Sequence, residues 1–242
     1  MSQSSPACDD GLVPTRRPDP PPWWKTAGEA ASGLEAARLA ARMPRLLRLP
    51  NGDGTPVVLT PGLGATDASL APLRRFLVRK RHDARPAGFG RIVPDVAGLA
   101  PRLIDLVADI RRETGRPVNL VGWSLGGVVS REVARHRPDL IGRVITFGTP
   151  VRGGPGSTAL GARLDPRQLD AIQDMMEARD RVPIRVPITA IRSPRDGVVA
   201  ADACIDTTSL EAENVVVRST HIGMGIDPDV WAIVARRLAA PT

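Results

Sequence analysis

The sequence contains no tyrosine, and aromatic residues make up only 3% of its 242 positions. Proteins that bind single-stranded nucleic acid stack bases on aromatic side chains, so this scarcity argues against that class of partner. The two cysteines, Cys8 and Cys204, are too few and too far apart to form a disulfide framework or a metal site. No apolar run approaches the length that a helix needs to cross a bilayer. We therefore expect a protein with neither a metal ion nor a membrane-spanning helix.

The formal net charge is +7, and arginine supplies nearly all of the basic residues, because Lys25 and Lys80 are the only lysines. The arginines are scattered among acidic residues, as in Arg111-Arg112-Glu113, and they form no basic tract. A nucleic-acid-binding protein would instead gather them on one face or along one helix. The pattern favours a solvated basic surface, and we predict no nucleic-acid partner.

Residues 1–50 predict a disordered tail followed by an amphipathic helix. The tail, residues 1–22, is rich in Ser, Asp, Arg and Pro and has little apolar content, a composition typical of disorder. It shows no signal-peptide pattern, so we expect a cytoplasmic protein.

The helix is expected within residues 23–43, which open with two tryptophans and continue with Ala, Leu and Arg at helical spacing from Ala27 to Met43. A basic amphipathic helix of this kind is suited to peripheral contact with a membrane surface. It is also suited to docking on the rest of the protein. Pro44 and the turn at residues 51–54 favour docking, because they connect the helix closely to the core.

Residues 51–242 alternate between strand and helix patterns. Apolar runs typical of strands occupy residues 56–60, 117–121, 140–147, 188–192 and 215–218, and residues 82–90 are expected to hold a strand with its exit loop. Helical patterns occupy residues 67–77, 98–114, 125–136 and 228–240. This alternation predicts an α/β fold with a mostly parallel central sheet and helices on both faces. With 42% hydrophobic residues, the chain is long enough for one sizeable core.

The alternation is interrupted between residues 150 and 186. Four glycines open this stretch, and Leu164, Leu169, Ile172, Met175 and Met176 follow in a pattern that indicates a short amphipathic helix. We interpret it as a small lid-like or cap-like insertion over the carboxyl edge of the sheet. An ordinary crossover helix is the alternative.

The chain is organised around Gly122-Trp123-Ser124-Leu125-Gly126. A buried-strand pattern runs directly into this Gly-x-Ser-x-Gly motif, and a helical pattern follows it, which is the context of a nucleophile elbow. Gly122 and Gly126 would remove side chains that clash with the neighbouring strand and helix. The sequence therefore predicts Ser124 as a nucleophile, exposed at the sheet edge and at a helix N-terminus.

A serine hydroxyl needs a base, and the chain has only three histidines. His136 is expected three turns along the helix that begins at the nucleophile, and His82 precedes a strand at the wrong edge of the sheet. His221 follows the last strand, where the loops at the carboxyl ends of the strands converge. We therefore predict His221 as the general base.

The base needs a carboxylate that fixes its tautomer. Asp196 directly follows the penultimate strand, in Ser193-Pro194-Arg195-Asp196-Gly197, and is our candidate. Asp202 and Asp206 lie in the next segment and remain alternatives.

The negative oxygen of a tetrahedral intermediate requires backbone N–H donors. One candidate is Leu125, next to the nucleophile. The other is Leu63, in the loop that leaves the first strand, where Gly62 and Gly64 let the backbone turn inward.

These motifs resemble those of the α/β-hydrolase superfamily, and among its members the small bacterial serine lipases and esterases. The resemblance covers about residues 55–240 and rests, in order, on Pro61-Gly62-Leu63-Gly64, Gly122-Trp123-Ser124-Leu125-Gly126-Gly127, Phe147-Gly148-Thr149-Pro150, Ser193-x-x-Asp196-Gly197-Val198-Val199 and Ser219-x-His221-x-Gly223-Met224. It implies acyl transfer through a covalent acyl-serine, without a metal or an organic cofactor. Two departures concern substrate preference: Pro61 and Val151 stand where lipases often have histidine.

The sequence thus predicts a serine hydrolase that cleaves carboxylic esters, with an apolar acyl chain in the substrate. An acyltransferase or a thioesterase would use the same triad and stays open as an alternative. An inactive binding protein on the hydrolase fold is the third possibility, against which the complete triad argues.

Overall fold

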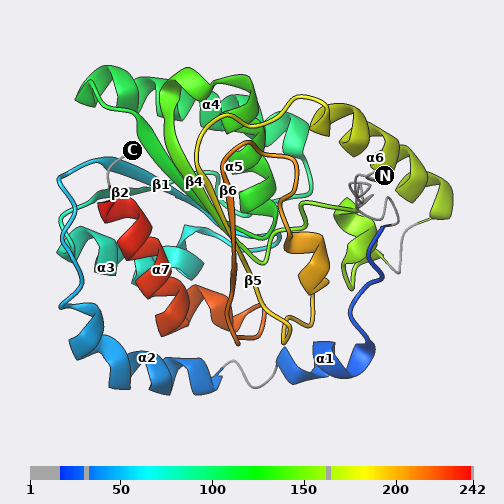
Figure 1. Cartoon of the computed structure of the whole chain (residues 1–242), viewed down its shortest axis with the longest axis horizontal. Coiled ribbons are helices and arrows are strands. Elements are labelled where there is room, and N and C mark those ends of the chain that lie inside the picture. Colours follow the sequence, from blue (N-terminus) through cyan, green and yellow to red (C-terminus); the bar gives the residue numbers. More distant parts are fainter. Residues whose placement is uncertain (1–16, 30–32, 162–164, 241–242) are drawn as a thin grey trace, which may run out of the picture.

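A computed structural model describes residues 17–29, 33–161 and 165–240 of the chain. Its centre is one six-stranded parallel sheet with the order β2-β1-β3-β4-β5-β6 (Figure 1). The strands are β1 (Pro56–Thr60), β2 (Asp83–Pro86), β3 (Val118–Trp123), β4 (Ile141–Phe147), β5 (Ile188–Arg192) and β6 (Ala212–Val216). The parallel sheet predicted from the alternation of strands and helices is confirmed.

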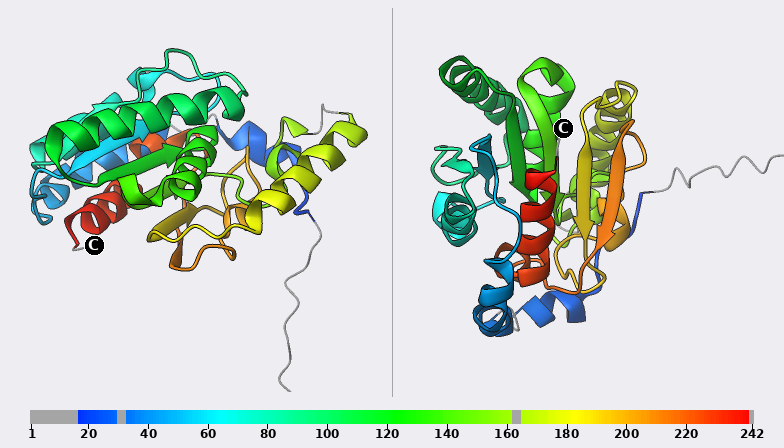
Figure 2. Two further views of the ribbon diagram at one scale, coloured as in Figure 1. Left: turned by 90° about the horizontal axis from the view of Figure 1, so that it is seen from above. Right: turned by 60° about the vertical axis from the view of Figure 1, so that its left-hand side comes forward.

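Helices cover both faces of this sheet. On one face lie α3 (Ala71–Arg79) and α7 (Pro228–Ala239), and on the other lie α4 (Val96–Thr114) and α5 (Leu125–His136) (Figure 2). Short 3-10 helices complete the connections: η2 (Asp67–Leu70), η3 (Pro138–Leu140), η4 (Gly154–Ser157), η6 (Ala201–Cys204) and η7 (Gly223–Ile226).

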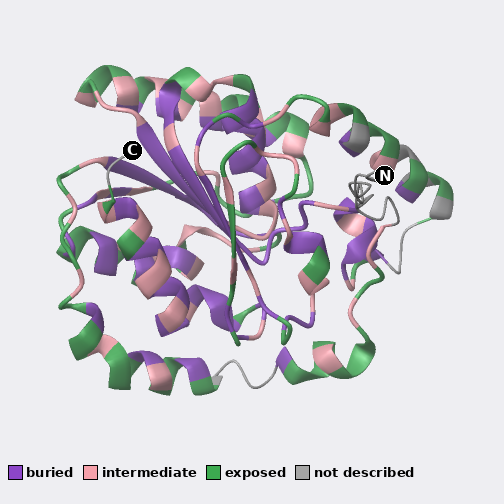
Figure 3. Cartoon of the chain, viewed as in Figure 1, coloured by how far each residue is buried: buried purple, intermediate pink, exposed green. Residues whose placement is uncertain are grey.

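Alternate residues of a strand point to opposite faces, so the central strands feed two cores. In β1, Val57 and Leu59 join the core beneath α3 and α7, whereas Val58 joins the core beneath α4 and α5. The inner strands are accordingly buried along their length (Figure 3). The edge strand β6 is largely exposed, and it begins three residues before the apolar run at 215–218 from which we predicted it.

The N-terminal part of the chain differs from the single helix expected from Ala27. In the described part of this region, the α-helices are α1 (Trp23–Ala27) and α2 (Gly33–Leu46). Leu39 and Leu46 of α2 are buried in the core beside α7, and Arg38 donates a hydrogen bond to Asp229 of α7 at 3.0 Å. The apolar face of α2 therefore packs on the rest of the protein.

Residues 17–22, which we predicted as part of the disordered tail, form an extended segment that contacts the body. The hydroxyl of Ser157 in η4 donates to the carbonyl oxygen of Pro18 at 2.8 Å. A proline-rich segment has few conformations to lose, so a few such contacts are enough to hold it. Residues 1–16, including Cys8, lie outside the described residues.

The segment at 150–186 contains η4 and the helix α6 (Pro166–Asp180). Leu169 and Met176 of α6 are buried, whereas Met175 is exposed. Arg135 of α5 donates a hydrogen bond to Asp180 at 2.8 Å and so links α6 to α5. Leu164 lies outside the described residues, and the role of this segment as a lid stays a prediction.

Candidate active site

Ser124 occupies a sharp turn between β3 and α5. Its backbone has φ 53° and ψ −121°, a conformation that a residue with a side chain rarely adopts. The turn is held on both sides, because the Ser124 N–H donates to the carbonyl of Phe147 at 2.9 Å and the Gly127 N–H donates to the carbonyl of Ser124 at 2.9 Å. Strain of this kind persists only where the surrounding structure enforces it, and it is typical of functional sites.

The glycines of the elbow are required by close packing. A Cβ at Gly126 would lie 2.1 Å from the carbonyl oxygen of Thr60, and one at Gly122 would lie 2.4 Å from the Cα of Gly127. Any side chain would therefore displace the helix from the strand. The roles of Gly122 and Gly126 in a nucleophile elbow stay a prediction.

The two predicted oxyanion donors are the backbone N–H groups of Leu63 and Leu125. Leu125 is the first residue of α5, and Leu63 lies in the loop after β1, whose Gly62 comes so near that an added Cβ would be 3.1 Å from the Ser124 Cβ. Among the described residues, the N–H groups of Leu63 and Leu125 donate to no acceptor. Two unpaired donors beside a candidate nucleophile are what an oxyanion site requires.

His221 and Asp196 form a buried pair, with exposed fractions of 5% and 2%. The Nδ1 atom of His221 lies 2.7 Å from Oδ2 of Asp196. The other carboxylate oxygen, Oδ1, accepts hydrogen bonds from the N–H groups of Val198 at 2.8 Å and Val199 at 2.7 Å. These two bonds orient the carboxylate. In the tautomer that donates from Nδ1 to Asp196, the other ring nitrogen, Nε2, is available to accept a proton.

The Gly148-Thr149-Pro150 turn packs against this pair, a role that the sequence did not reveal. Gly148 has φ 56°, and a Cβ there would come within 2.8 Å of Nδ1 of His221 and 3.3 Å of Oδ2 of Asp196. Thr149 links the same turn to the elbow, because its hydroxyl donates to the carbonyl oxygen of Ser124 at 3.1 Å. A substitution at Gly148 would therefore push the imidazole out of place.

The structure brings Ser124 and His221 to the same edge of the sheet, where the Trp123 ring lies 5.7 Å from the His221 ring between their centroids. Among the described residues, the Ser124 hydroxyl makes no hydrogen bond to His221. Such contacts are often loose before substrate binds and tighten in the reacting complex.

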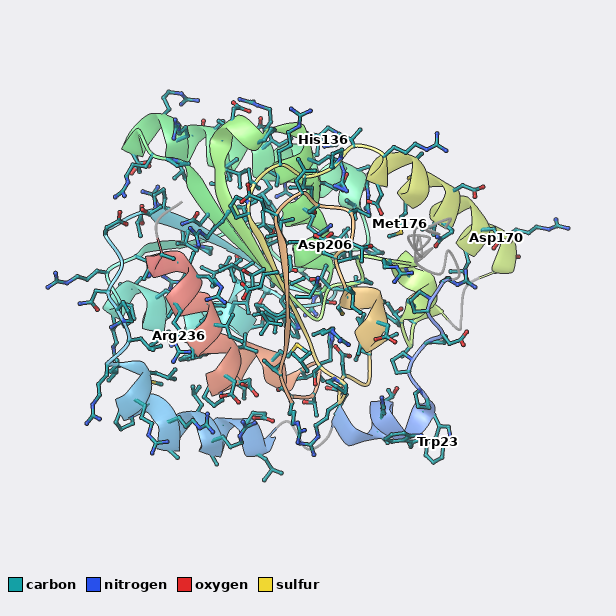
Figure 4. All side chains as sticks on the ribbon, viewed as in Figure 1. Trp23, His136, Asp170, Met176, Asp206 and Arg236 are labelled. Atoms are coloured by element: carbon teal, nitrogen blue, oxygen red, sulfur yellow. The ribbon has the colours of Figure 1, made fainter. Side chains whose placement is uncertain are left out.

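The other candidates for base and acid have different partners. His136 ends α5, remote from Ser124, and its Nδ1 lies 2.8 Å from the carbonyl of Glu132 (Figure 4). Asp206 is buried against Arg131 at 2.6 Å. Burial raises its pKa, but the charge of Arg131 and the hydrogen bonds from Arg131, Ser209 and Thr208 together lower the pKa to about 2. Asp202 is an exposed side chain 3.2 Å from Arg192. Of the acids considered, Asp196 is the one that contacts His221.

His82 lies before β2, at the opposite edge of the sheet from the candidate site, as predicted. Its ring is 3% exposed and packs against Gly52, and among the described residues neither ring nitrogen has a hydrogen-bond partner. Burial lowers the pKa of His82, the nearby Lys80 lowers it further, and Asp53 partly opposes both. His82 is thus a buried neutral base without a place in the site.

We expect this histidine to make the protein less stable in mild acid. Because the folded-state pKa lies below the unfolded value of about 6.5, the unfolded state binds more protons, and stability is lost as the pH falls below that value. Each unit of pKa difference corresponds to about 1.4 kcal/mol. Urea unfolding between pH 7.5 and 5.5 should show a smaller loss of unfolding free energy in His82→Phe than in wild type or the exposed His136→Phe control. Equal slopes in all three proteins would contradict the prediction.

No cluster of three or more His, Cys, Asp or Glu side chains that could hold a metal ion occurs in the described ranges. None of the helices within residues 17–29, 33–161 and 165–240 has the length and apolar character needed to cross a membrane. Trp23 and Trp24 of α1 are 81% and 58% exposed, and Trp23 points away from the body (Figure 4).

Comparisons with known proteins bear on the fold. No family model matches the chain. A triacylglycerol lipase of Pseudarthrobacter phenanthrenivorans is 33% identical over 108 residues, which are 40% of this chain and 34% of that protein, so the chain matches about a third of its relative. The mature form of a Bacillus licheniformis lipase superposes with a TM-score of 0.60 at 17% identity, covering 80% of this chain and 95% of that one. A monoacylglycerol lipase of Paleococcus ferrophilus gives a TM-score of 0.53 at 19% identity, covering 77% and 96%.

The chain therefore has the α/β-hydrolase fold, as the sequence motifs predicted. The resemblance to lipases and esterases among the proteins of this fold is also confirmed.

Proposed function

We propose that the chain is a serine hydrolase that cleaves carboxylic esters through an acyl-serine intermediate. The observation that carries the proposal is the buried His221–Asp196 pair, with a 2.7 Å contact, at the same sheet edge as a strained Ser124. Named lipases among the relatives and similar structures support ester hydrolysis as the reaction class. Fold alone does not determine function, so the proposal depends on the site.

In the proposed mechanism, Oγ of Ser124 attacks the ester carbonyl while Nε2 of His221 accepts the hydroxyl proton. Asp196 stabilises the imidazolium, and the N–H groups of Leu63 and Leu125 stabilise the oxyanion. The ester C–O bond then breaks, and the alcohol leaves with the proton from His221. Water, activated by the same histidine, releases the acid and restores Ser124.

We expect the acyl chain of the substrate to be apolar. The loops around the elbow carry apolar side chains, including the exposed Leu63 and the half-buried Trp123 and Leu125. Burial of each methylene contributes about 0.8 kcal/mol, so longer acyl chains should bind more tightly up to the size of the pocket. Contact of residues 23–43 with a membrane surface, where lipid esters reside, stays a prediction supported by the exposed Trp23 and Trp24.

The proposal is tested by labelling and turnover together. Purified protein is incubated with a fluorophosphonate probe, and the modified peptide is identified by mass spectrometry. In parallel, p-nitrophenyl esters of short and long acyl chains are assayed for a burst of nitrophenol. We expect the probe on Ser124, turnover with at least one chain length, and loss of turnover after labelling.

The alternatives predict different outcomes. An acyltransferase would be labelled on Ser124 but would release product faster when an alcohol acceptor is added. A thioesterase would prefer the corresponding thioester. Neither labelling nor turnover with any ester would contradict the proposal and favour an inactive binding protein.

A further inference from the structure

The N-terminal segment at residues 17–29 lies against the loop that carries Asp196, although it precedes the first strand of the sheet. The Lys25 ammonium donates to the carbonyl of Pro194 at 2.8 Å, and the Thr26 hydroxyl donates to the carbonyl of Gly197 at 2.6 Å. The approach is close, since a Cβ at Gly197 would lie 2.2 Å from the carbonyl oxygen of Lys25. The segment therefore packs closely against the loop that carries Asp196.

Glu29 of this segment contacts both loops of the His–Asp pair. Its Oε1 atom accepts hydrogen bonds from the N–H of Gly197 at 2.8 Å and from the N–H of His221 at 2.9 Å. Its Oε2 atom accepts from the N–H of Ile222 at 2.9 Å. The residue is 8% exposed, so these bonds form largely away from water. One carboxylate thus joins the backbone next to Asp196 to the backbone of His221 itself.

A buried carboxylate is costly unless its oxygens are hydrogen-bonded, and N–H bonds to a charged acceptor are stronger than those between neutral groups. The two loops follow different strands, β5 and β6, and Glu29 connects them from outside the sheet. Displacements of about 1 Å in a reacting group can lower the rate about 10²-fold. A group that fixes the distance between the two loops therefore affects the geometry of the pair.

We propose that Glu29 is a positioning residue, which holds the loops of Asp196 and His221 in register through their backbone N–H groups. The inference rests on the proposed function and deepens it. Under this inference, residues 17–29 contribute to the geometry of the site. Glu29 contacts the backbone of the base and acts on the reaction through it.

The test compares Glu29→Gln with wild type. Glutamine keeps the shape and one carbonyl acceptor, but it loses the charge and turns an NH2 group toward the N–H groups that faced the second oxygen. We expect kcat for a p-nitrophenyl ester to fall about 10- to 100-fold. KM should change less than about twofold, because the substitution alters no apolar side chain that could bind the acyl group. The rate of fluorophosphonate labelling should fall by the same factor as kcat.

Glu35→Gln is the matched control. Glu35 is also a buried carboxylate of the N-terminal region, but its carboxylate pairs with Arg38 on its own helix. Its Cγ lies close to Gly223, and glutamine keeps that atom in place. We expect Glu35→Gln to retain wild-type kcat. A loss of thermal stability in Glu29→Gln with kcat unchanged would show a merely structural role and overturn the inference.

A second measurement is independent of ester hydrolysis. The proton between His221 and Asp196 is expected to give a far-downfield NMR resonance in wild type. It should be absent in Asp196→Ala, shifted or broadened in Glu29→Gln, and unchanged in Glu35→Gln. If wild type cleaves no ester, the proposed function fails while this resonance still decides the role of Glu29. An unchanged resonance in folded Glu29→Gln would overturn the inference.

Discussion

Ser124→Ala should abolish ester hydrolysis, with kcat falling by about 10⁶-fold, the order of loss seen when a triad nucleophile is removed. The reason is chemical, because alanine offers no oxygen to form the acyl-enzyme. Binding should persist, since the hydroxyl makes no hydrogen bond among the described residues and its removal leaves the oxyanion donors in place. Steady-state kinetics with a p-nitrophenyl ester, joined to a competition assay for binding of the acid product, measure both effects.

The matched control is Ser69→Ala in η2. The Ser69 hydroxyl donates to the carbonyl of Thr66 at 2.8 Å within its own turn, so its removal should leave kcat near the wild-type value. Full hydrolysis by Ser124→Ala would refute the acyl-serine route. A residual rate would have a defined origin, since positioned donors alone can accelerate the reaction about 10³- to 10⁴-fold over water.

The sheet and the elbow were predictable because their signals are local. An apolar run that continues into Gly-x-Ser-x-Gly predicts a strand, a tight turn and a helix within a dozen residues, and the structure has β3, the Ser124 turn and α5 there. The position of His221 followed from topology, because carboxyl ends of parallel strands meet at one edge. The catalytic roles of Ser124, His221 and Asp196 stay predictions.

Contacts between distant segments were not predictable in this way. Glu29 binds the N–H of Gly197 across 168 positions of sequence. Its partners are backbone N–H groups, which nearly every residue has, so no pattern of side chains in the sequence could have predicted the contact. The proline-rich composition of residues 17–22 indicated disorder, yet the carbonyl of Pro18 accepts a hydrogen bond from Ser157. Composition indicates whether a segment can bury apolar surface by itself, but it gives no information on contacts with distant segments.

The edge strand illustrates a further limit. β6 (Ala212–Val216) carries Glu213 and Asn214 within its pairing with β5, so its apolar pattern is weak where its hydrogen bonding is regular. A search for apolar runs therefore places this strand too late. Gly148 likewise offers no functional group that a motif search would single out. Its importance lies in the space that it leaves for the His221 ring.

Asp196→Asn should lower kcat by about 10⁴-fold while the fold is retained. The asparagine carbonyl can still accept the N–H groups of Val198 and Val199, which fixes the side chain in the native orientation. Its NH2 group then faces Nδ1 of His221 and donates to it. The imidazole must carry its proton on Nε2, the tautomer that is unable to accept the proton of Ser124.

The two other carboxylates separate this effect from a general loss of charge. Asp202→Asn removes an exposed partner of Arg192 and should leave kcat unchanged, because surface ion pairs contribute at most about 1 kcal/mol to stability. Asp206→Asn leaves Arg131 buried without its charge partner at 2.6 Å, so it should lower the unfolding temperature more than kcat. If Asp196 is the triad acid, Asp196→Asn should show the largest loss of kcat and Asp206→Asn the largest loss of unfolding temperature. A folded Asp196→Asn protein with wild-type kcat, beside an inactive Asp202→Asn, would transfer the role to Asp202.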